Sequence, residues 1–161
     1  MKIIIISDIH DNLVNLEKCL NWCGKNKVKK IICLGDITNS ETLEYLAGNF
    51  KGEIFLVKSN IELFDELELK KYSQIKYCGE MGRLEINNKK IGICHEQYLA
   101  DRIIKQGPVD IIFYGHTHKP WEFQKDGIII INPGTLGGVF QKATFAVMEK
   151  ENIKLILLEQ I

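Results

Sequence analysis

The sequence predicts an α/β protein in which a two-sheet β-sandwich of mixed strands is flanked by helices. Two observations favour this class. In the first half, short apolar runs alternate with helical patterns, as they do in parallel β-α-β units. In the second half, paired strand-like runs flank short turns, which is typical of antiparallel hairpins. The length of 161 residues suits a single domain, 1–161.

Three strands and two helices are expected in the first half. The first strand is a continuous β-branched run, which suits a strand that is covered on both faces. Asp11 or Asn12 can cap the first helix, which Gly24 closes, and Ser40 can cap the second. The expected elements are a strand at 1–7, a helix at 13–24, a strand at 29–34, a helix at 40–48 and a strand at 53–57.

The second half of the chain is predicted to form antiparallel hairpins and one more buried strand. Asn87-Asn88 and Asp126-Gly127 are two-residue turn signals between strand-like runs. Gly107-Pro108 should stop a helix of about ten residues that ends at Gln106. The expected strands are 82–86, 89–94, 109–114, 121–125, 128–131, 143–148 and 153–158.

Charge and composition exclude several classes of function. The chain has 21 basic and 21 acidic residues, so no long-range field favours nucleic acid or an anionic membrane. No run approaches the roughly 18 apolar residues of a membrane span, and no signal peptide is evident, so we expect a cytoplasmic protein. A nucleotide-binding protein is not favoured, because no strand leads into a glycine-rich phosphate loop. Gly134, Gly137 and Gly138 follow a proline and are interpreted as turn residues.

Polar residues with metal-binding side chains gather at the ends of the predicted strands. All four histidines of the chain lie just beyond such a strand, close to two aspartates and one asparagine. Imidazole, carboxylate and amide ligands without thiolate suit Mn²⁺, Fe²⁺, Zn²⁺ or Ni²⁺ in a catalytic site. Seven ligands are too many for one ion and about right for two ions that share a carboxylate. The candidate metal ligands are Asp8, His10, Asp36, Asn60, His95, His116 and His118.

The ordered set Asp8-x-His10, Gly35-Asp36, Asn60, His95 and Gly115-His116-Thr117-His118 resembles the calcineurin-like metallophosphoesterases. The size of the chain and its Asn-Pro-Gly-Thr turn are similar to the short bacterial and archaeal phosphodiesterases of that superfamily. The resemblance implies that Asp8, His10 and His118 hold one metal and that Asn60, His95 and His116 hold the other. Asp36 would bridge them, and we expect Asp36, His95 and His116 to be catalytic.

Two divalent ions in such a site, Mn²⁺ first among the candidates and Ni²⁺, Fe²⁺, Zn²⁺ or Mg²⁺ after it, would hold a bridging hydroxide in line with the leaving group of a small phosphodiester. A diester is favoured over a monoester dianion because the chain has only two arginines, Arg83 and Arg102, to clamp a phosphate. The resemblance also shows departures. Ile61 and Gln97 stand where many relatives carry a histidine, so we expect slow turnover and a preference for good leaving groups.

One alternative stays open at the level of function. A eukaryotic retromer subunit shares the fold that the resemblance implies, yet it is a protein-binding scaffold with a degraded metal site. That class predicts missing ligands, whereas all seven are present here. The sequence is compatible with a homo-oligomer and does not define the oligomeric state.

Overall fold

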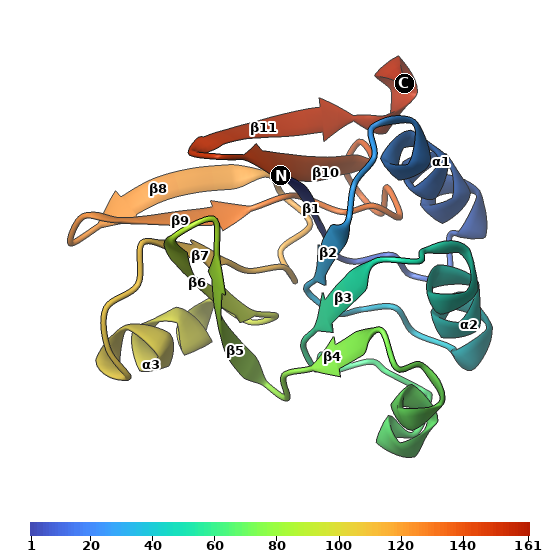
Figure 1. Ribbon diagram of the computed structural model, residues 1–161, viewed down its shortest axis with the longest axis horizontal. Coiled ribbons are helices and arrows are strands. Elements are labelled where there is room, and N and C mark those ends of the chain that lie inside the picture. The colour runs from blue at the N-terminus through green and yellow to red at the C-terminus, as the bar shows by residue number, and fades with distance from the viewer.

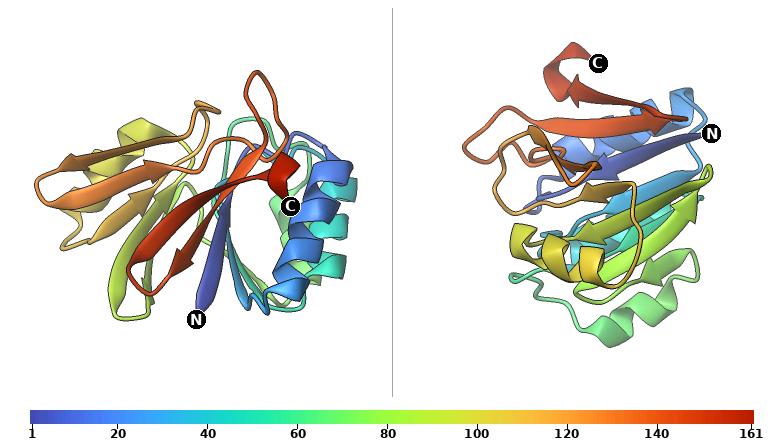
Figure 2. Two further views of the ribbon diagram at one scale, coloured as in Figure 1. Left: turned by 90° about the horizontal axis from the view of Figure 1, so that it is seen from above. Right: turned by 90° about the vertical axis from the view of Figure 1, so that its left-hand side faces the viewer.

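The computed structural model describes residues 1–161 as two β-sheets that pack face to face, with helices on the outer side of each sheet (Figures 1 and 2). The first sheet has six strands in the order β11-β10-β1-β2-β3-β4, and the second has five in the order β5-β6-β7-β9-β8. The predicted fold class is therefore confirmed. None of the helices is long and apolar enough to cross a membrane.

Apart from β4, which was not predicted, the elements of the first sheet and its helices begin and end close to the predicted positions. Their bounds are β1 Lys2–Ile6, α1 Leu13–Lys25, β2 Lys30–Cys33, α2 Ser40–Asn49, β3 Glu53–Leu56, β4 Ile75–Tyr77, β10 Thr144–Glu149 and β11 Asn152–Leu157. The elements of the second sheet are β5 Met81–Ile86, β6 Lys89–Cys94, α3 Ala100–Lys105, β7 Ile111–Phe113, β8 Trp121–Lys125 and β9 Ile128–Asn132. Short 3₁₀ helices span Glu66–Lys71, Gln97–Leu99 and Leu158–Gln160.

The isoleucine run of β1 supplies two cores at once. Ile4 and Ile6 face the core between the first sheet and helices α1 and α2. Ile3 and Ile5 face the core between the two sheets. Successive side chains of a strand point to opposite faces, so an uninterrupted apolar run is what a doubly covered strand requires. β1 thus lies at the centre of the molecule, and the loop that follows it is held from both sides.

Parallel pairing brings the ends of several strands to the same edge. β1 pairs in parallel with β2, and β2 with β3. In the second sheet β6, β7 and β9 are also parallel, with Ile91 opposite Ile111 and Ile111 opposite Ile129. The predicted hairpins β5–β6, β8–β9 and β10–β11 form as antiparallel pairs. The loops after β1, β2, β6 and β7 therefore leave their sheets at carboxyl ends, which is where α/β sheets keep their sites.

Two details of the helices correct the sequence predictions. Asn39, not Ser40, is the N-cap of α2, because its side chain accepts the backbone N–H of Thr42 at 2.9 Å. The helix of about ten residues before Gly107 is instead the 3₁₀ turn Gln97–Leu99 followed by the six residues of α3. α1 is capped by Asn12, one of the two predicted residues.

Candidate metal centre

Six of the seven candidate ligands lie in four loops, each just after a strand. Asp8 and His10 follow β1, Asp36 follows β2, and His95 follows β6 directly. His116 and His118 follow β7. Backbone hydrogen bonds join these loops within each sheet: Asp8 N–H donates to the Gly35 carbonyl at 3.1 Å, and Gly115 N–H donates to the His95 carbonyl at 2.9 Å. The two sheets are linked by the His116 N–H, which donates to Asp8 Oδ2 at 3.1 Å. The loops therefore form one connected surface at the carboxyl edge.

Most of these residues adopt a backbone conformation that side chains normally disfavour. Positive φ values between 48° and 66° occur at Asp8, His10, Asp36, His116 and His118. A non-glycine residue in this region costs roughly 1–3 kcal/mol, and such residues persist where the surroundings fix them. His10 is fixed in this way, since its N–H donates to the Asp36 carbonyl at 2.9 Å. The surrounding fold thus stabilises a strained backbone at the five residues whose side chains form the ligand clusters.

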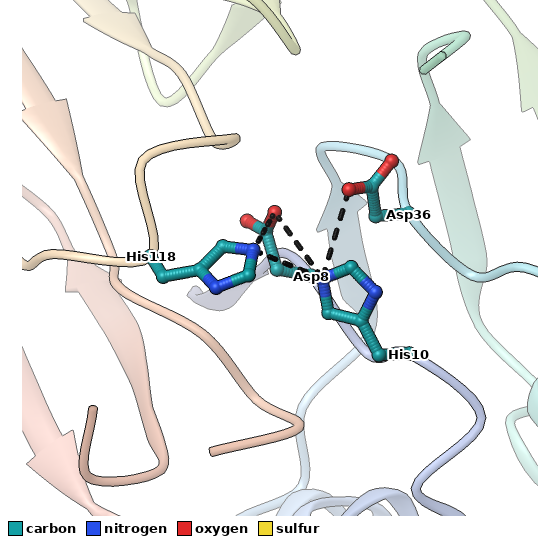
Figure 3. A group of neighbouring side chains, drawn as sticks. All are labelled: Asp8, His10, Asp36 and His118. Atoms are coloured by element: carbon teal, nitrogen blue, oxygen red, sulfur yellow. Dashed lines mark hydrogen bonds and ion pairs between the residues drawn. The ribbon is translucent and has the colours of Figure 1, made fainter. Parts of the chain in front are cut away.

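Four of the side chains form a first cluster (Figure 3). One ligand atom from each of Asp8, His10, Asp36 and His118 lies within 4.8 Å of the others. His118 Nε2 is 3.2 Å from Asp8 Oδ1 and 3.0 Å from His10 Nε2. His10 Nε2 is 3.7 Å from Asp36 Oδ2. These separations are those of atoms that share one bound cation.

A second cluster adjoins the first through Asp36. Its members are Asp36, His95 and His116, again within 4.8 Å of one another. His95 Nε2 lies 3.3 Å from Asp36 Oδ1, whereas His10 of the first cluster lies nearest Asp36 Oδ2. Asp36 therefore presents one carboxylate oxygen to each cluster, which is the geometry of a bridging ligand.

The hydrogen bonds of two histidines fix which ring nitrogen is free. His95 Nδ1 is 2.7 Å from the Leu34 carbonyl, and His118 Nδ1 is 3.2 Å from the Val139 carbonyl. A carbonyl oxygen only accepts, so each Nδ1 carries the proton and donates it. Each Nε2 then has a lone pair that faces an aspartate oxygen. A cation between the two would bind both atoms, and a backbone carbonyl on the far nitrogen is the usual support of a metal-binding imidazole.

The burial of these carboxylate and imidazole groups also favours a bound cation. Asp8 Oδ1, Asp36 Oδ1 and His95 Nε2 are buried and have no hydrogen-bond partner. Burial, with the nearby charge of Asp36, raises the pKa of Asp8 to about 7. Burial also lowers the pKa of His10 and of His95, so both rings are neutral at pH 7 and able to bind a metal. The residues present fit a pair of divalent cations, since these would give Asp8 Oδ1, Asp36 Oδ1 and His95 Nε2 a partner.

A segment that the sequence predictions treated only as a turn supports the first cluster. Leu136 N–H donates to the Ser7 carbonyl at 2.8 Å, and Gly137 N–H donates to the Asp8 carbonyl at 2.9 Å. The Thr135 hydroxyl donates to the same Asp8 carbonyl at 2.8 Å. Val139 accepts from His118, as described above. Residues 135–139 are therefore a backbone clamp, and only the Asn-Pro-Gly-Thr motif in the sequence pointed to them.

We expect the substitution Gly137→Ala to loosen this clamp. A Cβ at this position would lie 2.6 Å from the Ile9 carbonyl oxygen and 3.0 Å from that of Asp8. These are backbone atoms of the ligand loop and cannot rotate away, so overpacking by roughly 1–3 kcal/mol is expected. Thermal denaturation should show a lower Tm, and calorimetric titration with Mn²⁺ should show weaker binding.

Gly24→Ala is the matched control for that substitution. Gly24 lies in α1 with no atom within 4 Å of its added Cβ, and alanine stabilises a helix by up to about 1 kcal/mol relative to glycine. Its Tm should stay the same or rise, with unchanged Mn²⁺ affinity. Equal Tm values for the two variants would contradict the role assigned to residues 135–139.

One predicted ligand, Asn60, remains to be placed. Asn60 follows β3 with an exposed side chain, and it shares a cavity of about 210 Å³ with Glu96. Asn60 is thus near the second cluster, and its role as a ligand stays a prediction. Glu96, which the sequence predictions did not assign, places Oε2 3.7 Å from His116 Nε2.

Fold and site together define a metallophosphoesterase-like protein: two packed sheets whose strand ends carry paired imidazole–carboxylate clusters that share one aspartate. The chain belongs to the calcineurin-like phosphoesterase superfamily, whose domain model matches residues 1–152.

The relatives of this chain include a phosphodiesterase and a vacuolar protein sorting-associated protein. A phosphodiesterase of Methanocaldococcus jannaschii is 28% identical, over 99% of this chain and all of that protein. Vacuolar protein sorting-associated protein 29 of Schizosaccharomyces pombe is 25% identical, over 86% of this chain and 73% of that protein. Among solved structures, an archaeal phosphodiesterase superposes with a TM-score of 0.86 at 26% identity, over 98% of this chain and 99% of that one.

Proposed function

We propose that this protein, as a single domain over residues 1–161, is a dinuclear metal-dependent phosphodiesterase. The observation that carries the proposal is the trio of buried, unpaired atoms Asp8 Oδ1, Asp36 Oδ1 and His95 Nε2, of which the last two lie 3.3 Å apart. Three buried acceptors without a donor would be unfavourable in a purely structural cluster. A site that holds cations gives each of them a partner.

The ligand assignment follows the two clusters. Asp8, His10 and His118 would hold one ion, and His95 and His116 would hold the other with Asn60 from the loop after β3. Asp36 would bridge the two through its separate oxygens. This assignment is also the one that the resemblance of the motifs implies.

The chemistry expected here is hydrolysis at phosphorus. Two divalent ions, when bound, supply positive charge to the phosphoryl oxygens and acidify a water molecule that serves as the nucleophile. The protein orients this centre through the His116 N–H, which donates to Asp8 Oδ2. The Leu34 and Val139 carbonyls accept from His95 and His118 in the same way. We propose Mn²⁺ as the metal, with Ni²⁺, Fe²⁺, Zn²⁺ and Mg²⁺ as the ions to compare, and the cytoplasm as the compartment.

The contacts of the basic residues support a diester over a monoester. Arg83 donates to the Ile103, Gly107 and Pro108 carbonyls, and Arg102 pairs with Glu80 at 3.4 Å. Lys58, which follows β3 near the second cluster, pairs with Glu66 at 3.0 Å. None of the three is directed at the clusters, and a monoester dianion would need more positive charge than a diester. The resemblance of the chain to a phosphodiesterase points the same way.

The test is hydrolysis of bis(4-nitrophenyl) phosphate and of 4-nitrophenyl phosphate by protein freed of metal and reloaded with each ion. We expect turnover of the diester with Mn²⁺, a smaller rate on the monoester, and none without metal. Binding of Mn²⁺ without hydrolysis of either ester would instead favour the alternative, a protein-binding scaffold of the same fold.

A further inference from the structure

A cavity of about 450 Å³ opens directly beside the second cluster. His116 and Thr117 of the ligand loop form one wall, so whatever occupies the cavity lies next to the second metal position. The other walls come from the 3₁₀ turn and start of α3 and from strands β8 and β9, on the outer side of the second sheet (Figure 2). The volume lies in the range of small-molecule pockets.

Apolar and aromatic groups form much of this cavity. Ile130 is buried and Phe123 half-buried at its floor, and both pack in the core beneath α3. Tyr98 stands at the rim with 71% of its surface exposed. A ring that is open to solvent beside an apolar floor provides a face on which a flat group can stack.

The charges that line the cavity do not suit an anion. Lys125 is its one cationic side chain, and Asp101 pairs with it at 2.7 Å. Glu96 adds a second carboxylate, close to His116. Two acids against one paired base leave the cavity with a net negative charge at pH 7, which opposes a further phosphate or carboxylate on the ligand.

We propose that this cavity binds one organic group of the phosphodiester, and that this group is aromatic and uncharged. The proposal rests on the proposed function, since it takes the phosphoryl group to sit at the metal clusters. The proposed substrates of the protein are then diesters in which at least one alcohol is a neutral aromatic or heteroaromatic group. Esters whose group in the cavity carries a second anion are not expected to be substrates. Tyr98 and Phe123 are the specificity-determining residues.

The test uses ligands with one organic group each, so that their orientation is not in doubt. Calorimetry on the Mn²⁺-loaded protein would give Kd for phenylphosphonate, methylphosphonate and 4-carboxyphenylphosphonate. We expect phenylphosphonate to bind about tenfold more tightly than methylphosphonate, as burial of a ring predicts. Tyr98→Ala and Phe123→Ala should reduce that ratio to below about threefold. The added carboxylate should weaken binding, and Asp101→Asn, which frees Lys125, should recover much of the loss.

Trp121→Ala is the control, because Trp121 is an exposed aromatic on the same strand as Phe123 but lines a different cavity with Pro120 and Ile131. It should keep the wild-type ratio. Equal affinity for phenyl- and methylphosphonate, a ratio that survives both aromatic substitutions, or no binding of either phosphonate would overturn the proposal. Hydrolysis of bis(4-nitrophenyl) phosphate in the same preparation reports separately on the proposed function, so that the two failures are distinguishable.

Discussion

Replacing Asp36 with asparagine is expected to lower the rate of diester hydrolysis by at least about a thousandfold, the equivalent of losing several kcal/mol of transition-state stabilisation. Asp36 is the only residue shared by both clusters, with Oδ1 toward His95 and Oδ2 toward His10. An amide has a single strong acceptor oxygen and no charge, so it cannot bridge two cations. Initial rates on bis(4-nitrophenyl) phosphate with saturating Mn²⁺ would measure the loss.

The fold should survive this substitution. Asp36 is buried, and asparagine removes a charge from the immediate surroundings of a second buried carboxylate, Asp8. The circular dichroism spectrum and metal-free Tm should therefore match those of the wild type or improve. His116→Ala should also remove activity without unfolding, since its side chain is 44% exposed. Glu17→Gln, on the exposed face of α1, is the isosteric control and should keep full activity. Normal turnover by Asp36→Asn would rule out a bridging role.

Removing the metal should destabilise the protein as well as inactivate it. A ligand that binds only the folded state stabilises it by about 2.7 kcal/mol at a concentration one hundred times its Kd. For a domain of 161 residues, that corresponds to a rise in Tm of about 5–10 °C on adding Mn²⁺ to chelator-treated protein. Relief of the unpaired buried atoms is the physical reason for the gain.

Scanning calorimetry before and after Mn²⁺ addition provides this comparison. The rise should be much smaller in Asp36→Asn, which lacks the shared ligand, and preserved in Glu17→Gln. If the Tm of the wild type did not change on addition of Mn²⁺, the clusters would not bind this ion, whatever the activity assay gave.

Local sequence patterns predicted most of the fold because local physics sets most of it. The run Lys2–Ile6 reads as a doubly covered strand, and the structure places its alternate isoleucines in two different cores. Asn87-Asn88 and Asp126-Gly127 predicted hairpins, and all four residues have the positive φ that such turns need. β4 received no prediction, since three residues with half-exposed or exposed side chains carry too little pattern to identify.

The candidate site was visible in part from the sequence. Ligand side chains just past the ends of paired parallel strands lie close together, which explains why Asp8 and Asp36 could be linked before any coordinates. His95 follows a strand of the other sheet. The sharing of Asp36 between two clusters depends on how the second sheet packs on the first, and only a resemblance suggested it. The support from residues 135–139 is carried by backbone atoms, which leave little trace in a sequence.

The most direct test is to locate the ions themselves. Crystals of the protein grown with Mn²⁺ and measured at the manganese absorption edge should show two anomalous peaks about 3.5–4 Å apart. One peak should lie among Asp8, His10 and His118, the other beside His95 and His116, with Asp36 between them. A single peak, or two peaks without a shared aspartate, would contradict the dinuclear centre.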